Sequence, residues 1–261
     1  MAIGLIIIGD EILSGKRRDQ HFPKVVEMLA ERGLQLAWAE YVGDDSERIT
    51  ATLRRTMASG DIVFSCGGIG ATPDDRTRQC AAAALGKPLV LHPEGARHIQ
   101  ERIVEMAQEA GTTADLRSPE NLHRLKMAEF PQGAGLIPNP YNRIAGFSAG
   151  THHFVPGFPV MAWPMIAWVL DHHYSELFHR AARSEHAVLV FEQAESALTP
   201  LMEAIEAQYP LVKVFSLPSV GDASTRRHIE LGVKGEPAQA GAAFERMCAE
   251  LDRLKAEYRP A

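Results

Sequence analysis

Cysteine is scarce in this chain of 261 residues. Its three cysteines, Cys66, Cys80 and Cys248, are widely spaced and form no CxxC motif. We therefore expect reduced thiols in a reducing compartment. A basic excess is also absent, because the formal net charge is -6 at pH 7. This charge argues against nucleic acid as an electrostatic partner.

Long apolar runs are absent as well. The first apolar run, residues 3–8, has no basic segment before it, is followed at once by acids, and is too short to cross a bilayer. We interpret it as a first β-strand, expect no membrane association, and predict a cytoplasmic protein. A hydrophobic content of 46% and a charged content of 23% are ordinary for a globular protein. The length allows one large domain, or a medium and a small one.

The most informative motif is DIVFSCGGIGATPDDRT, residues 61–77. Its apolar start is typical of a buried parallel strand, and its three glycines indicate a sharp turn or a close approach to a ligand. Thr72 or Asp74 can then cap a helix over 75–85. A strand, a glycine loop and a helix N-terminus together favour phosphate binding. The motif is neither GxGxxG nor a GxxxxGK[ST] P-loop, so neither mechanism applies.

Two carboxylates, Asp74 and Asp75, lie in the same loop. They would repel a bare phosphate, but they are compatible with one when a divalent cation such as Mg²⁺ lies between. The structural alternative is plain helix capping, which the glycines alone do not exclude.

Three expected strands each end in a pair of acids. The strands are residues 3–8, 34–42 and 61–66, and the acid pairs are Asp10–Glu11, Asp44–Asp45 and Asp74–Asp75. Helices over 19–33 and 46–59 separate the strands, with Asp19 and Ser46 as their expected caps. This alternation predicts an α/β domain with a mostly parallel sheet and helices on both faces. Ligands of such sheets bind at the carboxyl ends of the strands, where these acids gather. Asp is common in turns, so single acids would carry little weight, but doubled acids at successive strand ends favour a metal–phosphate site.

The rest of the chain carries weaker signals. Helices are expected over 93–110, 118–127 and from Pro159, and short strands at 136–137, 144–148 and 153–155. The adjacent pairs His152–His153 and His172–His173 diverge on a strand or helix, so we interpret them as structural. After residue 182 a β-α-β-β-α pattern predicts a small separate α+β unit without a glycine–acid loop.

Four motifs together resemble the molybdopterin-binding fold of the MoaB/Mog proteins and, most closely, the N-terminal domain of CinA-type competence/damage-inducible proteins. The motifs are GDEILSG at 9–15, VGDD at 42–45, GGIGATPDDRT at 67–77, and the closing segments from Pro138 to Pro159. They cover residues 1–175, and the tail resembles the KH-like domain that follows in CinA-type proteins. The deamidase domain that ends full CinA is not in this sequence.

The resemblance implies a three-layer α/β/α domain at 1–178, a small KH-like α+β domain at 183–261, and a homo-oligomer. It implies a small-molecule ligand, molybdopterin or an adenine nucleotide, together with Mg²⁺ or another divalent metal. CinA-type members resemble metal-dependent pyrophosphatases acting on ADP-ribose or FAD. Mog-type members adenylylate molybdopterin in cofactor biosynthesis.

The resemblance also assigns site residues. Asp44 and Asp75 occupy the positions of the acting carboxylates and are the predicted metal ligands. The remaining predicted ligand-binding residues are Gly9, Asp10, Glu11, Ser14, Gly67, Gly68, Gly70, Thr72, Asp74, Thr77, Asn139, Pro140 and Gly146.

This sequence departs from the family pattern at residues 142–146, at Val160–Met161 and at Asp19–Gln20–His21. A second hypothesis therefore stays open, in which the same loops bind a pterin or nucleotide without turnover. The sequence does not choose between pterin, ADP-ribose and FAD.

Overall fold

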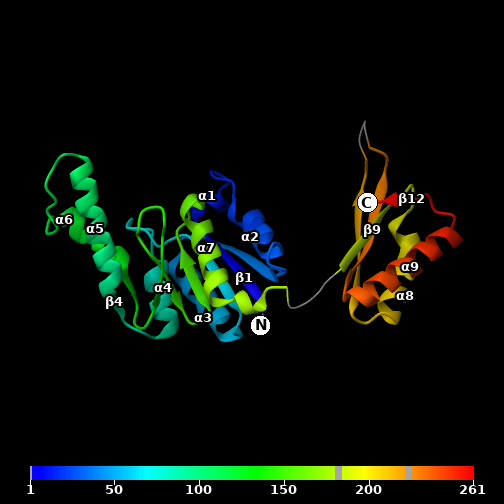
Figure 1. Ribbon diagram of the computed structural model, residues 1–261, viewed down its shortest axis with the longest axis horizontal. Coiled ribbons are helices and arrows are strands. Elements are labelled where there is room, and N and C mark those ends of the chain that lie inside the picture. Colours follow the sequence, from blue (N-terminus) through cyan, green and yellow to red (C-terminus); the bar gives the residue numbers. More distant parts are fainter. Residues whose placement is uncertain (1, 180–183, 222–224) are drawn as a thin grey trace. The chain divides into compact units, whose positions relative to one another are not determined.

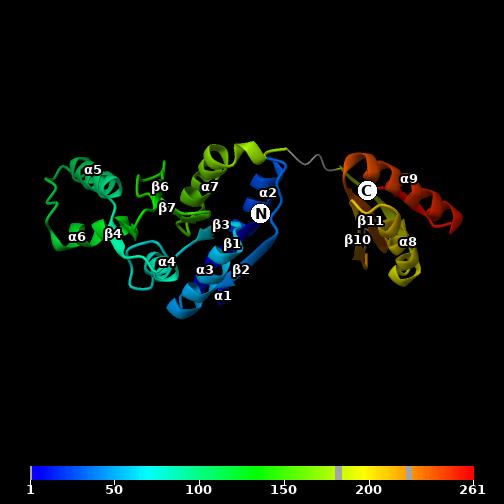
Figure 2. The ribbon, with the colours of Figure 1, turned by 90° about the horizontal axis from the view of Figure 1, so that it is seen from below.

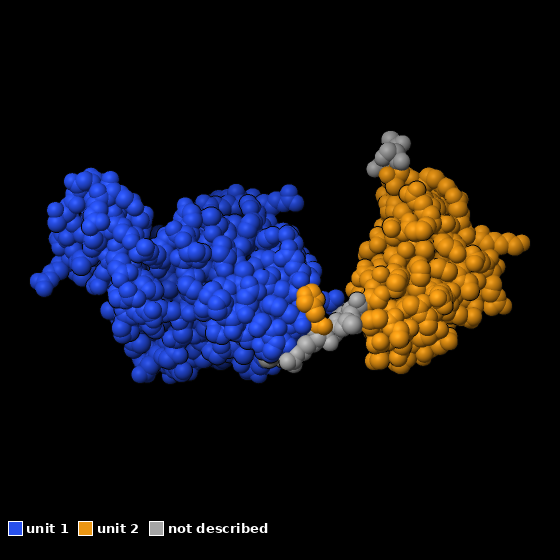
Figure 3. Space-filling model, in the orientation of Figure 1, with its two compact units in different colours: residues 1–178 blue, residues 179–261 orange. Residues whose placement is uncertain are grey.

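The computed structural model describes residues 2–179, 184–221 and 225–261. The chain divides into two compact units, residues 1–178 and 179–261 (Figure 3). Each unit has its own hydrophobic core.

The first unit is organised around a six-stranded sheet with the order β2-β1-β3-β8-β7-β6. Its strands are β1 (Ile3–Ile8), β2 (Trp38–Val42), β3 (Ile62–Cys66), β6 (Gly135–Ile137), β7 (Gly146–Ala149) and β8 (His152–Val155). β1 pairs in parallel with β2 and β3, and β3 pairs in parallel with β8. β7 runs antiparallel to both β8 and β6. The predicted mostly parallel α/β sheet is therefore confirmed.

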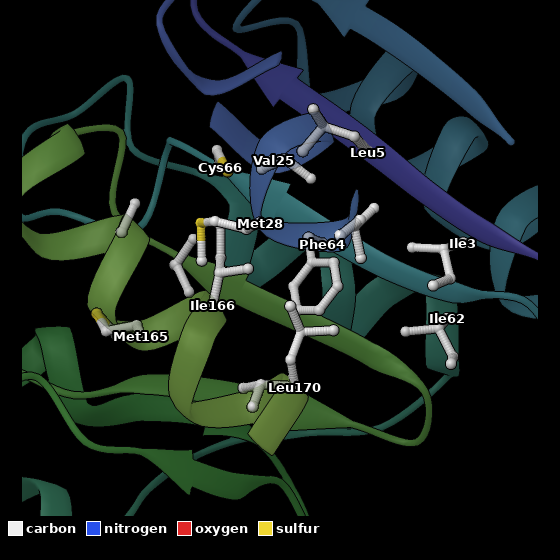
Figure 4. Packing of buried hydrophobic residues seen from close by; sticks show 14 of the residues in the cluster. Ile3, Leu5, Val25, Met28, Ile62, Phe64, Cys66, Met165, Ile166 and Leu170 are labelled. Atoms are coloured by element: carbon white, nitrogen blue, oxygen red, sulfur yellow. The ribbon is translucent and has the colours of Figure 1, made fainter. Parts of the chain in front are cut away.

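Helices cover both faces of this sheet (Figures 1 and 2). They are α1 (Asp10–Leu13), α2 (His21–Ala30), α3 (Ser46–Ser59), α4 (Thr77–Leu85) and α7 (Pro159–His173), with a 3₁₀ turn η2 (Ser175–Leu177). Side chains alternate along β1, so Leu5 packs with α2 and α7, whereas Ile6 packs with α3 and α4. Figure 4 shows the first of these cores, where Phe64 lies among Met28, Ile166 and their neighbours. Every residue of β1 is buried, as expected for a strand covered on both faces.

A smaller arm extends the first unit beyond α4 (Figures 1 and 2). It consists of β4 (Leu89–Leu91), α5 (Pro93–Glu109), α6 (Pro119–Leu125), the 3₁₀ turn η1 (Lys126–Ala128) and β5 (Glu129–Pro131). β4 and β5 pair antiparallel. The two helices were predicted, but this strand pair, which joins segments far apart in sequence, was missed.

The second unit is an antiparallel sheet with the order β10-β11-β9-β12. Its elements are β9 (Ser184–Phe191), α8 (Glu195–Gln208), β10 (Val212–Ser219), β11 (His228–Gly235), α9 (Pro237–Arg253) and β12 (Tyr258–Pro260). The helices bury one sheet face through residues such as Leu201 and Met247. The expected β-α-β-β-α pattern thus gains a final strand, β12, which pairs with β9.

Several predicted boundaries are wrong for local reasons. The helix expected from Asp75 begins at Thr77, and the strand expected from Leu34 begins at Trp38. Asp45, not Ser46, caps α3, because its carboxylate accepts from the Arg48 N–H over 2.8 Å. No helix among the described residues is long and apolar enough to cross a membrane.

The histidine pair in β8 is structural. His152 and His153 are 1% and 2% exposed, and their ring nitrogens bond to hydroxyl groups. The partners are Thr56 for His152, and Ser148 and Tyr174 for His153, at 2.7–2.9 Å. Burial lowers the pKa of His152 to about 4 and that of His153 to about 3. Both rings are therefore neutral near pH 7.

Candidate functional site

The carboxyl ends of β1, β2, β3 and β8 lie at the same edge of the sheet, so the loops that follow these strands meet there. Two backbone hydrogen bonds join them: Gly9 N–H donates to the Val42 carbonyl and Gly67 N–H to the Val155 carbonyl, both over 3.0 Å. The chain leaves β1 toward α2 on one sheet face and leaves β3 toward α4 on the other. Ligands of open α/β sheets bind at such a reversal of direction.

The glycine loop after β3 packs directly against β1. Gly67 and Gly68 have φ angles of 111° and 68°, which favour glycine. A Cβ atom on Gly67 would lie 2.3 Å from the Ile8 carbonyl oxygen, and one on Gly68 would lie 2.2 Å from Thr77 Oγ1. Both glycines are therefore required by close approach as well as by backbone conformation.

The same loop presents a run of backbone donors. The N–H groups of Gly68, Ile69 and Gly70 have no acceptor in the part of the chain that the structure describes. Thr77 holds two carbonyls of the same loop. Its N–H donates to the Gly68 carbonyl over 2.9 Å, and its hydroxyl donates to the Gly67 carbonyl over 3.1 Å. Successive unpartnered N–H groups before a helix N-terminus are suited to an anion.

Asp10 and Asp44 hold each other across the β1 and β2 loops. The Asp10 N–H donates to Asp44 Oδ2 over 2.9 Å, and the Asp44 N–H donates to Asp10 Oδ1 over 3.2 Å. Burial is the largest influence on the pKa of Asp44 and raises it. The hydrogen bond from the Asp10 N–H lowers this pKa, whereas the charges of Asp10, Glu11 and Asp74 raise it. The charges of Asp10, Glu11 and Asp74 thus act on Asp44, and a bound cation would relieve the repulsion among these four acids.

The Asp75 carboxylate is oriented by hydrogen bonds from its own loop. Its Oδ2 atom accepts from the Thr72 N–H over 3.0 Å and from the Thr72 hydroxyl, while the Asp75 N–H donates back to the Thr72 carbonyl over 3.0 Å. These bonds close residues 72–75 into a turn, which is why α4 begins only at Thr77. Thr72 therefore orients the Asp75 carboxylate and does not cap the helix.

Two pockets flank this edge, one on each face of the sheet. On the α2 and α7 side, a cavity of about 230 Å³ is lined by Glu11, Arg17, Arg18, His21 and Phe158 among others. His21 is 4% exposed, and its Nε2 lies 3.0 Å from the Gly157 carbonyl, so that Nε2 carries the proton. Its Nδ1 atom is buried and has no partner among the described residues.

On the α3 and α4 side, a larger cavity of about 520 Å³ lies beside Asp75. Thr72, Arg76, Arg78 and Lys126 are among its lining residues. One acid of the edge lines each pocket, Glu11 the smaller and Asp75 the larger.

Three predicted residues lie away from these pockets. Asn139 is 4% exposed, and its side-chain amide forms hydrogen bonds within its own loop. Its Nδ2 donates to Asn142 Oδ1 over 2.8 Å and to the Ile144 carbonyl over 3.0 Å. Its Oδ1 accepts from the Tyr141 N–H over 3.0 Å. Pro140 is exposed next to it. Gly146 begins β7, where a Cβ atom would lie 2.3 Å from the Phe154 carbonyl oxygen. The structure thus gives Asn139 and Gly146 structural roles.

Ser14 is also exposed, at the end of α1, where its N–H donates to the Asp10 carbonyl. Gly9 precedes α1 and is buried. Both therefore shape the loop that carries Asp10 and Glu11.

The oxygen-rich edge fits a hard divalent cation. Asp10 and Asp44 each use one carboxylate oxygen for the other's N–H, and Asp75 uses one for Thr72. The second oxygen of each accepts no hydrogen bond among the described residues. Among the described residues, no three His, Cys, Asp or Glu side chains converge as a ready metal site. A cation held here would need phosphate oxygens and water to complete its shell, as Mg²⁺ commonly does beside one or two carboxylates.

Sequence reasoning missed Arg78 and His21. Arg78 lies on α4 three and four residues before the buried Ala81 and Ala82, so helical periodicity alone places this charge on the buried face. His21 is the first residue of α2, and nothing in its sequence context indicates that its ring turns back to Gly157.

Comparison with known proteins identifies relatives of this chain. Residues 4–226 match the family described as "Probable molybdopterin binding domain". A CinA-like protein of Anaeromyxobacter sp. (strain K) is 29% identical over 256 residues, which cover 90% of this chain and 60% of that protein. A CinA-like protein of Geobacter metallireducens is 34% identical over 163 residues, covering 61% of this chain and 37% of that protein. The chain thus spans about 60% of the length of the first of these relatives.

A solved structure shares the fold. The protein CinA of Thermoplasma acidophilum, whose function is described as unknown, aligns with a TM-score of 0.55 and 24% identity. The alignment covers 66% of this chain and 98% of that one. The resemblance drawn from the four sequence motifs is therefore confirmed for family and fold.

Proposed function

Because the chain belongs to the family of probable molybdopterin-binding domains, we propose that its strand-end loops bind a phosphorylated pterin or an adenine dinucleotide and cleave a phosphoanhydride bond with a divalent metal ion. The substrate class is that of ADP-ribose or FAD. One observation carries the proposal: the unpartnered N–H groups of Gly68, Ile69 and Gly70 lie in the loop that also carries Asp74 and Asp75. The donors bind phosphate oxygens, and the acids hold the cation that phosphate brings with it.

Each residue has a part in this reaction. Asp44 and Asp75 hold the metal ion, and Asp10 and Thr72 orient these two carboxylates through the hydrogen bonds described above. When bound, the ion neutralises the phosphates and polarises the phosphorus that is attacked. The glycine loop binds the oxygens on which charge accumulates.

The chemistry is a hydrolysis. The oxygen of water attacks one phosphorus, and the bond from that phosphorus to the bridging oxygen breaks. ADP-ribose and water thus give AMP and ribose 5-phosphate. The proton of the attacking water passes to a neighbouring carboxylate that does not hold the ion.

The ring system of the ligand is assigned to the pocket lined by His21 and Phe158. Phe158 is 54% exposed and offers an apolar ring surface, while the unpartnered His21 Nδ1 can accept from a ring N–H or amino group. Pterin, adenine and flavin all carry such a donor.

Binding without turnover is the second candidate function. The self-contained hydrogen bonds of Asn139 favour it, because that loop does not reach toward a nucleotide. Transfer of an adenylyl group to molybdopterin is a further variant of the same site. We also propose a homo-oligomer, as in the related families.

The test is incubation of the purified chain with ADP-ribose or FAD in the presence of Mg²⁺, Co²⁺ or EDTA, followed by product analysis. Metal-dependent AMP formation is expected, with a loss of at least about 100-fold in Asp75→Ala, since such electrostatic groups supply that much. Asp45→Ala, the same change at a helix cap on the same edge, is the matched control. Turnover that survives in Asp75→Ala contradicts the assignment. Ligand-induced thermal stabilisation without product supports the binding module.

A further inference from the structure

The guanidinium of Arg78 is a buried positive charge without an ion-pair partner. Arg78 is 3% exposed. Its Nη2 donates to the Gly70 carbonyl over 2.6 Å, and its Nη1 donates to the Lys126 carbonyl. Its Nε atom is buried and has no partner among the described residues, and no described carboxylate forms an ion pair with the guanidinium.

Such an arrangement is costly unless something compensates it. A buried charge without an opposite charge or a full set of acceptors is strongly unfavourable. Burial lowers the pKa of Arg78, and the carboxylates of Asp75 and Glu129 act only in the opposite direction at longer range. The guanidinium therefore retains unused capacity to bind an anion.

Arg78 lines the cavity of about 520 Å³ beside the glycine loop. Arg76 and Lys126 line it too, so three cations face two carboxylates, Asp75 and Glu129. The Ser46 hydroxyl adds a neutral donor to the cavity, whereas the hydroxyls of Thr50 and Thr72, which also line it, donate to the Ser46 carbonyl and to the Asp75 carboxylate. Donors of these types, around a planar guanidinium, are those that bind tetrahedral phosphate.

We propose that this cavity is a phosphate subsite, with Arg78 as its buried anchor and Lys126 of η1 closing it from the arm. Its role rests on the proposed function, because it would receive the phosphate on the far side of the anhydride that is cleaved beside Asp75. Binding of the phosphate itself does not depend on turnover. A phosphate here would also connect the glycine loop to η1, which Arg78 already bridges through its two carbonyl bonds.

The experiment is calorimetric titration of the full chain with inorganic phosphate and, separately, with ribose 5-phosphate, in EDTA and at constant chloride. Saturable binding is expected, weakened about tenfold or more in Arg78→Met, because hydrogen bonds to charged groups have that strength. Lys126→Met serves where Arg78→Met does not fold, since Lys126 is exposed, and it is expected to weaken binding severalfold. Lys213→Met, the same change on an exposed lysine of the second unit, is the matched control.

One further variant separates this inference from the proposed function. Asp75→Asn abolishes metal-dependent hydrolysis under the proposed function, yet it removes a repulsive charge from the cavity and should preserve or strengthen phosphate binding in EDTA. Phosphate binding without any turnover contradicts the proposed enzymatic activity but still supports the phosphate subsite. Affinity unchanged in both Arg78→Met and Lys126→Met, or no phosphate binding at all, overturns the subsite. Tighter binding of ribose 5-phosphate than of inorganic phosphate identifies an ester as the occupant.

Discussion

The two units of this chain both combine helices with a sheet, but the strands of the two sheets run in different ways. In the first unit β1, β2, β3 and β8 run parallel, so every loop after these strands reaches the same edge. In the second unit all strand pairs are antiparallel, so the loops that follow neighbouring strands of the sheet lie at opposite ends. The strand ends followed by doubled acids, Asp10–Glu11, Asp44–Asp45 and Asp74–Asp75, belong to the first unit. Strand direction, not helix or strand content, therefore decides where polar side chains can accumulate into a site.

The largest effect is expected from a glycine that the first unit's site requires. In Gly68→Ala the new Cβ would meet Thr77 Oγ1 at 2.2 Å, at a φ of 68° that disfavours alanine. We expect a destabilisation of more than about 2 kcal/mol, with loss of ligand binding, because clash and backbone strain add.

Gly241 of α9 in the second unit is the matched control. A Cβ atom there meets nothing within 4 Å, so Gly241→Ala should stabilise its helix by roughly 0.5–1 kcal/mol. Urea unfolding of both variants measures the difference. Equal effects of the two substitutions would show that the glycine loop is not packed as described.

Acid should unfold the first unit before the second. His152 and His153 have folded-state pKa values of about 4 and about 3, below the unfolded value near 6.5. The unfolded chain therefore binds protons first as pH falls. Their stabilising contribution is complete above pH 6.5 and is lost between there and the folded pKa values. For His152 alone the loss is on the order of 3 kcal/mol.

Tryptophan fluorescence can follow this transition, because Trp38, Trp163 and Trp168 all belong to the first unit. The described residues of the second unit include no fully buried histidine. His152→Gln should flatten the pH dependence of first-unit stability. An unfolding midpoint that does not change between pH 7 and pH 5 would contradict the buried neutral histidines.

The gathering of acids at one sheet edge could be predicted because it follows from strand direction, and direction follows from the β-α-β alternation. The roles of the individual acids could not be predicted from the sequence. Asp44 and Asp45 are indistinguishable by type, yet Asp44 pairs with Asp10 across the sheet, whereas Asp45 bonds three residues ahead to Arg48. Which of the two carboxylates joins the β1 and β2 loops is decided by a contact between residues 34 positions apart.

The same limit explains Arg78 and β4. A charge on a buried helix face signals a tertiary partner, but the carbonyls that Arg78 meets belong to Gly70 and to Lys126, 48 residues away. A strand of three residues such as β4 is too short to show a periodic hydrophobic pattern, and only its pairing with β5 defines it as a strand. The environment of Arg78 and the strand pair β4–β5 are determined by contacts between residues far apart in sequence, so local propensity could not predict them.

A smaller effect separates the two acids of one pair. Asp45→Ala should cost about 1 kcal/mol, the usual value of a helix cap, and leave ligand affinity unchanged. Asp44→Ala should abolish metal-dependent turnover. In the second unit Glu236 caps α9 through the N–H groups of Ala238 and Gln239, so Glu236→Ala should resemble Asp45→Ala in stability. Turnover lost equally in Asp44→Ala and Asp45→Ala would refute the division of roles.

The smallest effect concerns the charge on Asp10. Asp10→Asn keeps an oxygen for the Asp44 N–H and keeps its own backbone N–H, so the reciprocal pair survives. It removes one of the charges that raise the pKa of Asp44, although burial, the larger cause, remains. Carboxyl carbon NMR should therefore show the pKa of Asp44 shifted down but still above its ordinary value. Glu47→Gln, an exposed acid on α3, is the control and should not move it. A pKa that stays in place in Asp10→Asn would mean that the acids at this edge are uncoupled, and repulsion relieved by a cation could no longer explain why they gather there.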